Sequence, residues 1–403
     1  MKTAGSMHAS AGKDVFTAAA STVPAPAAPA RPRLQSIDLM RGLVVALMAL
    51  DHTREYFSDT GLNPRHVTEP VLFLTRWITH LCAPTFVLLA GISAYLYTTR
   101  GKTTGEVSRF LLTRGLWLIL IEFTLIRFGW TFDPNFFYDP VAGIIWVIGA
   151  SMVALAAIIY LPRWAILALG LGMIAGHNLL DGTEAGRLGS AAPLWHVLHE
   201  PGRIGINPQF SFYILYPLIP WIGVMALGYG LGPVMQLEPS ERRHVLFWLG
   251  AAVTLGFILL RAVNLYGDPG PWSGQASPLA TVLSFINCEK YPPSLLYLMM
   301  TLGPALMLLS VKEHTRGRIA DWLTVYGRVP FFFYVVHIYL IHLLAVAAGL
   351  ALTGKFEIGE SGVDLGLPAV YLVWLVVLVL LYPTCRWFAA LKQRRRDWWL
   401  SYL

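Results

Sequence analysis

Apolar runs of about twenty residues recur along most of the chain and are separated by short polar segments. A helix needs roughly 20 mainly apolar residues to cross a bilayer. The pattern therefore predicts about ten membrane-spanning helices. They are placed near residues 36–57, 71–98, 109–128, 140–161, 163–180, 211–232, 244–264, 291–311, 329–349 and 367–390.

The first 33 residues do not share this pattern. Ala18–Ala30 consists almost entirely of Ala, Pro, Ser, Thr and Val, with no continuous apolar run, and Pro24, Pro26 and Pro29 break any helix. These features are typical of a disordered segment and not of a signal peptide. We expect a disordered cytoplasmic tail over residues 1–33 and one membrane domain over residues 34–403.

Composition narrows the fold class. Hydrophobic residues make up 56% of the 403 residues and charged residues only 13%, whereas soluble domains carry about 25% charged residues. The 14 Trp, 17 Tyr and 20 Phe include many near the ends of apolar runs, as in membrane-interface belts. The predicted fold is an all-α, polytopic transmembrane helix bundle in a lipid bilayer.

Charge predicts the orientation of the bundle. The net charge of +7 is not clustered with aromatic residues on one face, which argues against nucleic-acid binding. Basic residues instead occupy alternate loops, and acidic residues the others, which is the positive-inside pattern. We therefore expect both termini in the cytoplasm. Representative inside residues are Arg100, Lys102, Arg109, Arg114, Arg163, Arg242, Arg243, Lys312, Arg316 and Arg328, and outside residues are Asp133, Asp139, Asp181, Glu184, Asp268, Glu357, Glu360 and Asp364.

The sequence carries few of the common catalytic or metal-binding signatures. Cys82, Cys288 and Cys385 show no C-x-x-C spacing, and their odd number argues against a disulfide framework. We interpret Cys82 and Cys288 as small buried residues. There is no H-E-x-x-H, G-x-S-x-G, P-loop or dinucleotide motif. No bound metal is predicted.

The first span carries the most informative polar residues. Arg41 and His52 are 11 residues apart, so they share a helix face and lie about 16 Å apart along the axis. Asp38 can pair with Arg41 across one turn. The planar guanidinium of an Arg can bind a phosphate group through two hydrogen bonds, so Arg41 suits a phosphate-bearing ligand. A His side chain gains or loses a proton near neutral pH, so His52 suits proton transfer. Alternatively, these residues simply mark the inner and outer ends of the span.

Other ionisable residues fall in the outer half of the predicted bundle. Arg76 and His80 share a face of the second span, Arg261 ends the seventh, Lys290 precedes the eighth and His337 lies within the ninth. Such residues are functional candidates in a bilayer. Each also has a simpler explanation, because interfacial cations and interhelical His residues are common. Together they predict a polar chamber open outward.

The pattern then resembles a known family. Ser36–Gly42 leading to Asp51 and His52 is similar to the opening span of transmembrane acyltransferases, and the Arg41–His52 spacing resembles the Arg/His motif of the acyltransferase-3 family. The whole pattern resembles bacterial relatives of heparan-alpha-glucosaminide N-acetyltransferase more than it resembles the acyltransferase-3 family. The segments that support this are Arg76–Trp77, Ala83–Phe86, Gly91, Pro217–Gly223, Lys290–Ser294 and Pro330–His337.

The resemblance implies a function. It implies acetyl-CoA or another acyl-CoA as donor, a glycan-type amine or hydroxyl as acceptor on the outer side, and a multi-pass protein of a bacterial-type inner membrane. A homodimer is compatible with it. In the lysosomal enzyme of this family, the functional His follows the first span. The corresponding loop here is Ser58–Pro70, so His66 stays a candidate beside the favoured His52.

We therefore expect three groups of site residues. His52, His80 and Lys290 are the expected catalytic residues, with Arg76, His80 or Lys290 stabilising the oxyanion. Arg41 and Asp38 are the expected acyl-CoA-binding residues. The expected substrate-binding residues are Arg76, Asp51, His66, His337 and Arg261. The alternatives are a secondary transporter of a small anion or sugar, and an inactive scaffold.

Overall fold

The computed structural model describes residues 1, 34–58, 65–136, 140–207, 210–311, 317–354, 363–395 and 397–402. The predicted tail, except Met1, lies outside these residues, as do Asp139, Lys312, Arg316, Glu357 and Glu360. The chain divides into Met1–Leu34 and Gln35–Leu403. The architecture below is that of the second unit.

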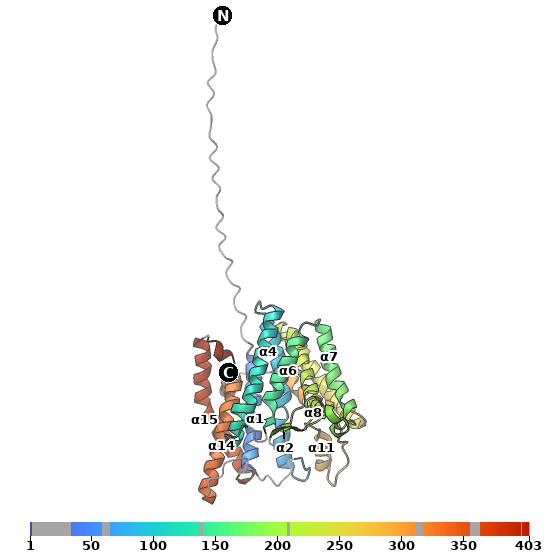
Figure 1. Ribbon diagram of the computed structural model, residues 1–403, viewed down its shortest axis with the longest axis vertical. Helices are drawn as coiled ribbons and strands as arrows, with labels where there is room; N and C mark the ends of the chain where they lie inside the picture. Colours follow the sequence, from blue (N-terminus) through green and yellow to red (C-terminus); the bar gives the residue numbers. More distant parts are fainter. Residues whose placement is uncertain are drawn as a thin grey trace. The chain divides into compact units, whose positions relative to one another are not determined.

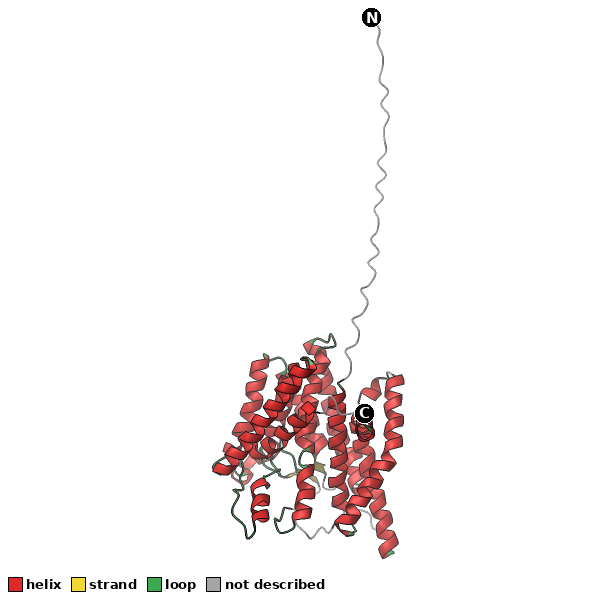
Figure 2. Ribbon diagram, turned by 180° about the vertical axis from the view of Figure 1, so that it is seen from behind, coloured by secondary structure: helices red, strands yellow, loops and turns green. Residues whose placement is uncertain are grey.

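This unit is built almost entirely from helices (Figure 1, Figure 2). The α-helices are α1 (Gln35–Phe57), α2 (Pro70–Thr79), α3 (Cys82–Thr98), α4 (Thr104–Ile121), α5 (Arg127–Thr131), α6 (Ile144–Ile158), α7 (Arg163–Gly176), α8 (Ala192–Leu198), α9 (Leu218–Leu231), α10 (Pro239–Val263), α11 (Pro278–Ile286), α12 (Leu295–Val311), α13 (Arg318–Arg328), α14 (Pro330–Thr353) and α15 (Gly366–Arg394). Short helices are the π-helix η1 (Glu122–Ile126) and the 3-10 helices η2 (His177–Leu180), η3 (Ala185–Arg187), η4 (Gly189–Ala191), η5 (Gly232–Gln236) and η7 (Trp398–Ser401).

The helical, membrane character of the chain is confirmed. Within the described residues, six helical segments are long and apolar enough to cross a membrane, and α6 and α12 are shorter apolar helices. Each of the ten predicted ranges contains a helix. The number of ten crossings and the cytoplasmic ends stay predictions. The six segments are Pro70–Thr98, Arg163–Leu180, Leu218–Gln236, Pro239–Val263, Pro330–Thr353 and Gly366–Arg394.

The predicted start of the span 211–232 is wrong. The range 211–232 begins as strand β3 (Phe210–Ile214), which pairs antiparallel with β2 (Gly202–Asn207) and parallel with β1 (Val141–Ala142). Phe210–Ile214 is rich in aromatic residues, which favour strands. Pro217 then holds an extended backbone as the N-cap residue of α9. The small sheet therefore forms where a longer helix was expected.

Helix α13 was missed, because its charged residues were assigned to a loop. It packs against the first turns of α1 through two glycines. A Cβ on Gly42 would overlap the carbonyl of Leu323, and one on Gly327 would overlap that of Asp38. Small residues allow such close helix contacts in membranes. The contact fixes the Asp38 end of α1.

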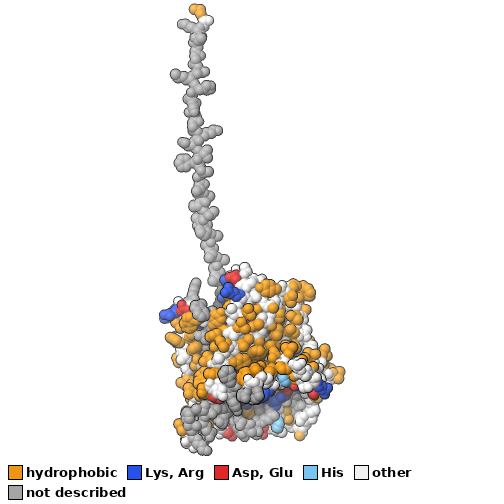
Figure 3. Space-filling view, viewed as in Figure 1, with side chains coloured by type: hydrophobic (Ala, Val, Ile, Leu, Met, Phe, Trp, Pro, Cys, Tyr) orange, Lys and Arg blue, Asp and Glu red, His pale blue; other side chains and the backbone are white. Residues whose placement is uncertain are grey.

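Helix α1 is the central element of the bundle, since it contacts α2, α3, α12, α13, α14 and α15. Leu39, Val44, Val45 and Ala49 on it are completely buried. Helix α15 instead exposes many large apolar residues. Figure 3 shows hydrophobic side chains covering most of the middle of the visible face, with charged ones toward its margins. This distribution suits a lipid-facing surface with an internal polar site.

Candidate functional site

The site centres on a pair of histidines from α1 and α14. His52 Nδ1 lies 2.7 Å from His337 Nε2, and the two rings are nearly parallel. His337 Nδ1 lies 3.0 Å from the carbonyl oxygen of Phe333, so a neutral His337 donates there. His337 Nε2 is then an acceptor, and His52 Nδ1 must carry the proton that it accepts. The lone pair of His52 therefore sits on Nε2.

Aromatic rings hold the His52 ring in place. Trp130 meets it edge-on with centroids 4.7 Å apart, and Tyr334 meets it at 6.1 Å. The Tyr56 hydroxyl donates to the Trp130 carbonyl at 2.6 Å and its ring stacks on the indole. His52 itself remains partly exposed. The imidazole is thus oriented on one side and accessible on another.

The π-helix η1 precedes Trp130 and is anchored by a carboxylate. Glu122 is buried and accepts a hydrogen bond from the backbone nitrogen of Trp146 at 2.7 Å, at the N-terminus of α6. A carboxylate is favourable there, because the helix dipole and free N–H groups attract it. Glu122 therefore fixes the segment that delivers Trp130.

Asp51 does not orient His52. Its carboxylate forms an ion pair with Arg54 at 3.2 Å, and Arg54 also contacts Glu55 at 2.7 Å. The charges of Asp51, Arg54 and Lys290 all act on His52. The orienting partner is His337, which the sequence placed only in the substrate-binding group.

Three predicted residues lie close enough to one another for their charges to interact. Arg76 ends α2, His80 follows it by one turn, and Lys290 lies in the loop between α11 and α12. The Tyr297 hydroxyl of α12 donates to the His80 carbonyl at 3.0 Å, which joins the two regions. The Lys290 ammonium lies 5.1 Å from the centre of the Tyr291 ring. His80 and Lys290 are both buried.

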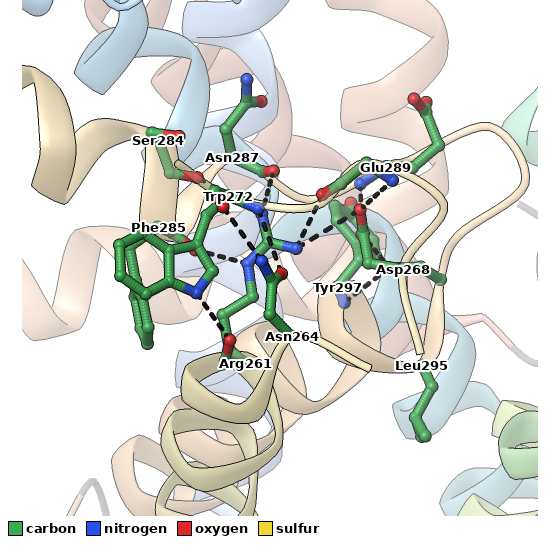
Figure 4. Close-up of polar contacts among 12 residues, drawn as sticks. Arg261, Asn264, Asp268, Trp272, Ser284, Phe285, Asn287, Glu289, Leu295 and Tyr297 are labelled. Carbon is green, nitrogen blue, oxygen red and sulfur yellow. Dashed lines mark hydrogen bonds and ion pairs between the residues drawn. The ribbon is translucent and has the colours of Figure 1, made fainter. Parts of the chain in front are cut away.

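The loop that carries Lys290 is held by a buried ion pair (Figure 4). Arg261 Nη1 lies 3.5 Å from Asp268 Oδ1. Asp268 Oδ2 accepts from Glu289 N at 2.8 Å and from the Ser294 hydroxyl at 2.6 Å. Glu289 Oε1 in turn accepts from the backbone nitrogen of Lys290 at 3.0 Å. The loop conformation thus depends on this chain of contacts.

Arg261 is a structural residue in this arrangement, not a free substrate clamp. Its guanidinium is almost fully buried and donates to four backbone carbonyls. Three of them end α11, at Ser284, Phe285 and Asn287 (Figure 4). Its capacity to donate is used within the fold. Its expected contact with substrate stays without support.

Arg41 lies at a separate place on α1. Its guanidinium donates to the Ser93 hydroxyl of α3 and lies 3.7 Å from the Asp38 carboxylate. Arg114 of α4 is near enough for the two charges to interact. The predicted Asp38–Arg41 pair is therefore present. Two arginines approach each other at this end of α1, where a phosphate-bearing ligand would be favoured.

His66 is described and stands apart from these contacts. Its side chain is exposed, and its carbonyl accepts from Glu69 N at 3.2 Å. Its neighbour Arg65 binds Glu289 at 2.7 Å. In the described part of the chain, no hydrogen bond, ion pair or ring contact joins the His66 side chain to His52. The geometry favours His52.

Sequence reasoning missed four contributors to the site. In the sequence, Trp130 is consistent with an aromatic residue at the membrane interface and Asp268 with an acidic residue of an outer loop. Arg54 and Glu289 lie at the ends of predicted spans, where charged residues are common. The missed signal was the grouping of Asp268, Glu289 and Ser294 around one polar loop. Such pairing across a loop has no fixed spacing in sequence.

The described cysteines are free and buried, as predicted for Cys82 and Cys288. The Cys82 thiol donates to the Val44 carbonyl at 3.2 Å. Within the residues that the structure covers, no three His, Cys, Asp or Glu side chains are grouped to hold a metal ion.

Comparison with known families gives one match. The family described as "Heparan-alpha-glucosaminide N-acetyltransferase, catalytic" matches residues 33–260, more than half of the chain. The matched range includes Arg41, His52, Arg76 and His80, and it ends before Lys290 and His337. No curated protein matches the chain.

Proposed function

Because the chain belongs to the heparan-alpha-glucosaminide N-acetyltransferase catalytic family, we propose that it is a membrane acyltransferase that uses cytoplasmic acyl-CoA. The acceptor is a sugar-type amine or hydroxyl on the outer side. The hydrogen bond between His52 and His337 carries this proposal, because it leaves a lone pair on His52 Nε2 for proton transfer.

The proposed step is attack of the acceptor on the thioester carbonyl. His52 Nε2 takes the proton from the attacking nitrogen or oxygen as the new bond to carbon forms. The carbon–sulfur bond then breaks, and the departing CoA thiolate takes the proton back from His52. His337 stays neutral throughout and holds the ring in one tautomer. The nearby Asp51 carboxylate favours the transient imidazolium.

A covalent route uses the same nitrogen. His52 Nε2 would attack the thioester itself, release CoA and carry the acyl group to the acceptor. A burst of CoA release without acceptor would mark this route. CoA release that occurs only when both the donor and the acceptor are present would indicate direct transfer.

The donor is proposed to enter from the Arg41 end of α1. Arg41 and Arg114 offer cationic partners for the phosphates of CoA. His52 lies about 16 Å farther along the helix axis, so the donor must extend along α1 to present its thioester. This layout requires a donor that is long and charged at one end, which acyl-CoA is.

The proposed topology has ten crossings with both ends in the cytoplasm of an inner, or plasma, membrane. It is supported by the six long apolar segments, by α6 and α12, and by helices in the remaining predicted ranges, α1 and α4–α5. Single cysteines at Arg100 and at Glu184 should be labelled by a membrane-impermeant thiol reagent from opposite sides of sealed vesicles. Labelling of both from one side would contradict the topology.

The function is tested with purified protein, labelled acetyl-CoA and a panel of amino sugars. We expect CoA release that depends on the acceptor. His52→Ala should abolish this release, and His66→Ala should leave it unchanged. His244→Ala, on the exposed start of α10, is the matched control. Full turnover by His52→Ala would overturn the assignment. Counterflow of a labelled sugar in liposomes without CoA would instead support transport.

A further inference from the structure

Tyr334 lies against both histidines of the catalytic pair but has no part in the steps proposed above. Its ring meets that of His337 edge-on with centroids 5.5 Å apart, and that of His52 edge-on with centroids 6.1 Å apart. Tyr334 precedes His337 by three residues on α14, so the two side chains share a face of the helix. In the part of the chain that the structure describes, no other tyrosine is in ring contact with His52.

The Tyr334 hydroxyl has one side-chain partner among the described residues. The Trp130 indole donates a hydrogen bond to its oxygen. An indole N–H can only donate, so the phenol oxygen is the acceptor and its own hydrogen is left to donate elsewhere. The charge of Glu122 acts on Tyr334, but the Glu122 carboxylate is bound to the backbone nitrogen of Trp146 at 2.7 Å. Because Tyr334 is buried and a buried donor without an acceptor is unfavourable, its hydroxyl is ready to donate to a bound group.

The segment that carries Trp130 is fixed to the same helix. The Tyr339 hydroxyl of α14 donates to the Leu125 carbonyl at 2.7 Å, and His342 Nδ1 of α14 lies 2.9 Å from the Gly129 carbonyl oxygen. Leu125 belongs to the π-helix η1, and such helices occur frequently at functional sites. These contacts hold the indole and the phenol in one rigid arrangement beside the imidazole.

The cations expected at the oxyanion are not in direct contact with His52. In the described residues, no hydrogen bond, ion pair or ring contact joins the imidazole to the side chain of Arg76, His80 or Lys290. Lys290 instead hydrogen-bonds the Tyr291 side chain and lies 5.1 Å from the centre of its ring. Its charge acts on His52 from a distance, whereas the ring of Tyr334 touches that of His52 edge-on.

The chemistry of the proposed step requires a hydrogen-bond donor at this place. The thioester carbonyl must lie beside His52 Nε2, because the acceptor that attacks it gives its proton to that nitrogen. Negative charge then develops on the carbonyl oxygen. A fixed donor aimed at that oxygen stabilises the charge, and a Tyr hydroxyl can serve as such a donor. The bond from Trp130 to the phenol oxygen polarises the O–H group and strengthens its donation.

We propose that Tyr334 is a further catalytic residue, which donates a hydrogen bond to the oxyanion of the tetrahedral intermediate. Trp130 is its positioning residue. Tyr334 forms no covalent bond and keeps its proton throughout, while the proton of the acceptor passes to His52 and then to the CoA thiolate. This inference rests on the proposed acyltransferase function and adds one residue to its machinery.

The first test is Tyr334→Phe, which keeps the ring and removes the hydroxyl. We expect kcat to fall by about 100–1,000-fold, the usual effect of losing one oxyanion donor, with little change in the KM for acetyl-CoA. The matched control is Tyr371→Phe in α15, which loses a hydroxyl that lies 2.6 Å from the Thr75 hydroxyl. This control should keep the wild-type kcat. A wild-type kcat in Tyr334→Phe would overturn the proposal.

A second test reads the oxyanion itself. In dithioacetyl-CoA a sulfur atom replaces the carbonyl oxygen, and sulfur is a weak hydrogen-bond acceptor. The ratio of kcat with acetyl-CoA to kcat with dithioacetyl-CoA should be much lower in Tyr334→Phe than in the wild-type protein. A purely structural defect would lower both rates by the same factor, and an unchanged ratio would therefore overturn the proposal.

A third test concerns the positioning residue. Trp130→Phe removes the indole N–H but keeps an aromatic ring beside His52, so it should lower kcat less than Tyr334→Phe does. In the double variant, Trp130→Phe should add little further loss, because the hydroxyl that the indole supports is already gone. Fully additive losses would overturn the assignment of Trp130 as the partner of Tyr334.

Failure of this proposal is distinct from failure of the proposed function. If Tyr334→Phe does not fold, 3-fluorotyrosine at position 334 still decides, because it keeps the hydroxyl and makes it a stronger donor. This variant should retain or raise kcat at pH 7, and a large fall would overturn the proposal. No CoA release by the wild-type protein with any acceptor would instead count against the enzyme itself.

Discussion

His52 Nδ1 and His337 Nε2 lie 2.7 Å apart, although 285 residues separate them in the chain. The backbone carbonyl of Phe333 sets the tautomer of His337, and His337 sets that of His52. A backbone group thereby determines which nitrogen of the proposed base is free. Partners of this kind are a common way to orient a functional imidazole.

His337→Ala should lower kcat by about 10–100-fold, by analogy with the loss of a partner that orients a metal-bound imidazole. The KM for acyl-CoA should change little, because His337 lies away from the Arg41 end of α1. His337→Gln keeps a side-chain oxygen that can accept from His52 Nδ1, so it should retain more activity. Steady-state kinetics of well-folded variants check this. Equal activity of the Ala and Gln variants would argue against an orienting role.

Arg41→Leu should raise the KM for acetyl-CoA by about tenfold or more, since a charge-assisted contact to phosphate is removed. The same variant should act normally on acetyl-pantetheine, which lacks the nucleotide phosphates. Arg109→Leu, an exposed residue of α4, serves as the control. The outcome that contradicts the assignment is an equal loss with both donors.

Arg261→Met should destabilise the protein by about 3–5 kcal/mol, because it leaves the buried Asp268 carboxylate without its cation. Adding Asp268→Asn removes that stranded charge and should restore part of the loss. Denaturant unfolding in detergent measures both variants. Additive losses in the double variant would show that the two residues do not act as a pair.

Gly42→Ala should destabilise by about 1–3 kcal/mol, as overpacking does, because the new Cβ meets the Leu323 carbonyl. Gly172→Ala in α7 is a matched control, since no atom lies within 4 Å of its added Cβ. That change should be neutral or slightly stabilising, because Ala favours helices over Gly. Thermal unfolding of both variants decides, and similar Tm values would contradict the close contact.

Asp181 should make stability depend on pH in the acid range. Partial burial acts to raise its pKa, but hydrogen bonds from His199 and Asn178 outweigh it, and the pKa lies below its ordinary value of 3.8. A lowered folded-state pKa adds stability that is complete above about pH 4 and is lost as pH falls through the folded value. Asp181→Asn should therefore lower Tm at pH 7. The difference from the wild-type protein should shrink toward pH 3, and a constant difference would contradict this.

Much of the fold could be predicted from the sequence. A helix that crosses a lipid bilayer must be long and apolar, and charged residues lie near its ends. Every predicted range holds a helix, and the Asp38–Arg41 pair forms. Helix α13 escaped prediction because its amphipathic pattern carries charges typical of a loop. Strand β3 escaped prediction because a mainly apolar segment of five residues does not by itself distinguish strand from helix.

The site was only partly predictable. His52, Arg76, His80 and Lys290 stood out because ionisable residues are costly in a bilayer. Which of them pair depends on tertiary contacts, so Arg261 and His337, both predicted to bind substrate, have different contacts in the structure. Arg261 donates to backbone carbonyls at the end of α11, while His337 contacts the proposed base.

The contacts of α1 with α13 and α14 have a consequence for how the chain is synthesised. Helix α1 leaves the ribosome well before α13 and α14, which carry Gly327 and His337. Until then the polar face of the nascent helix lacks these neighbours. Productive insertion therefore requires α13 and α14 to close around α1, and a product truncated before α14 would lack the His337 partner of His52.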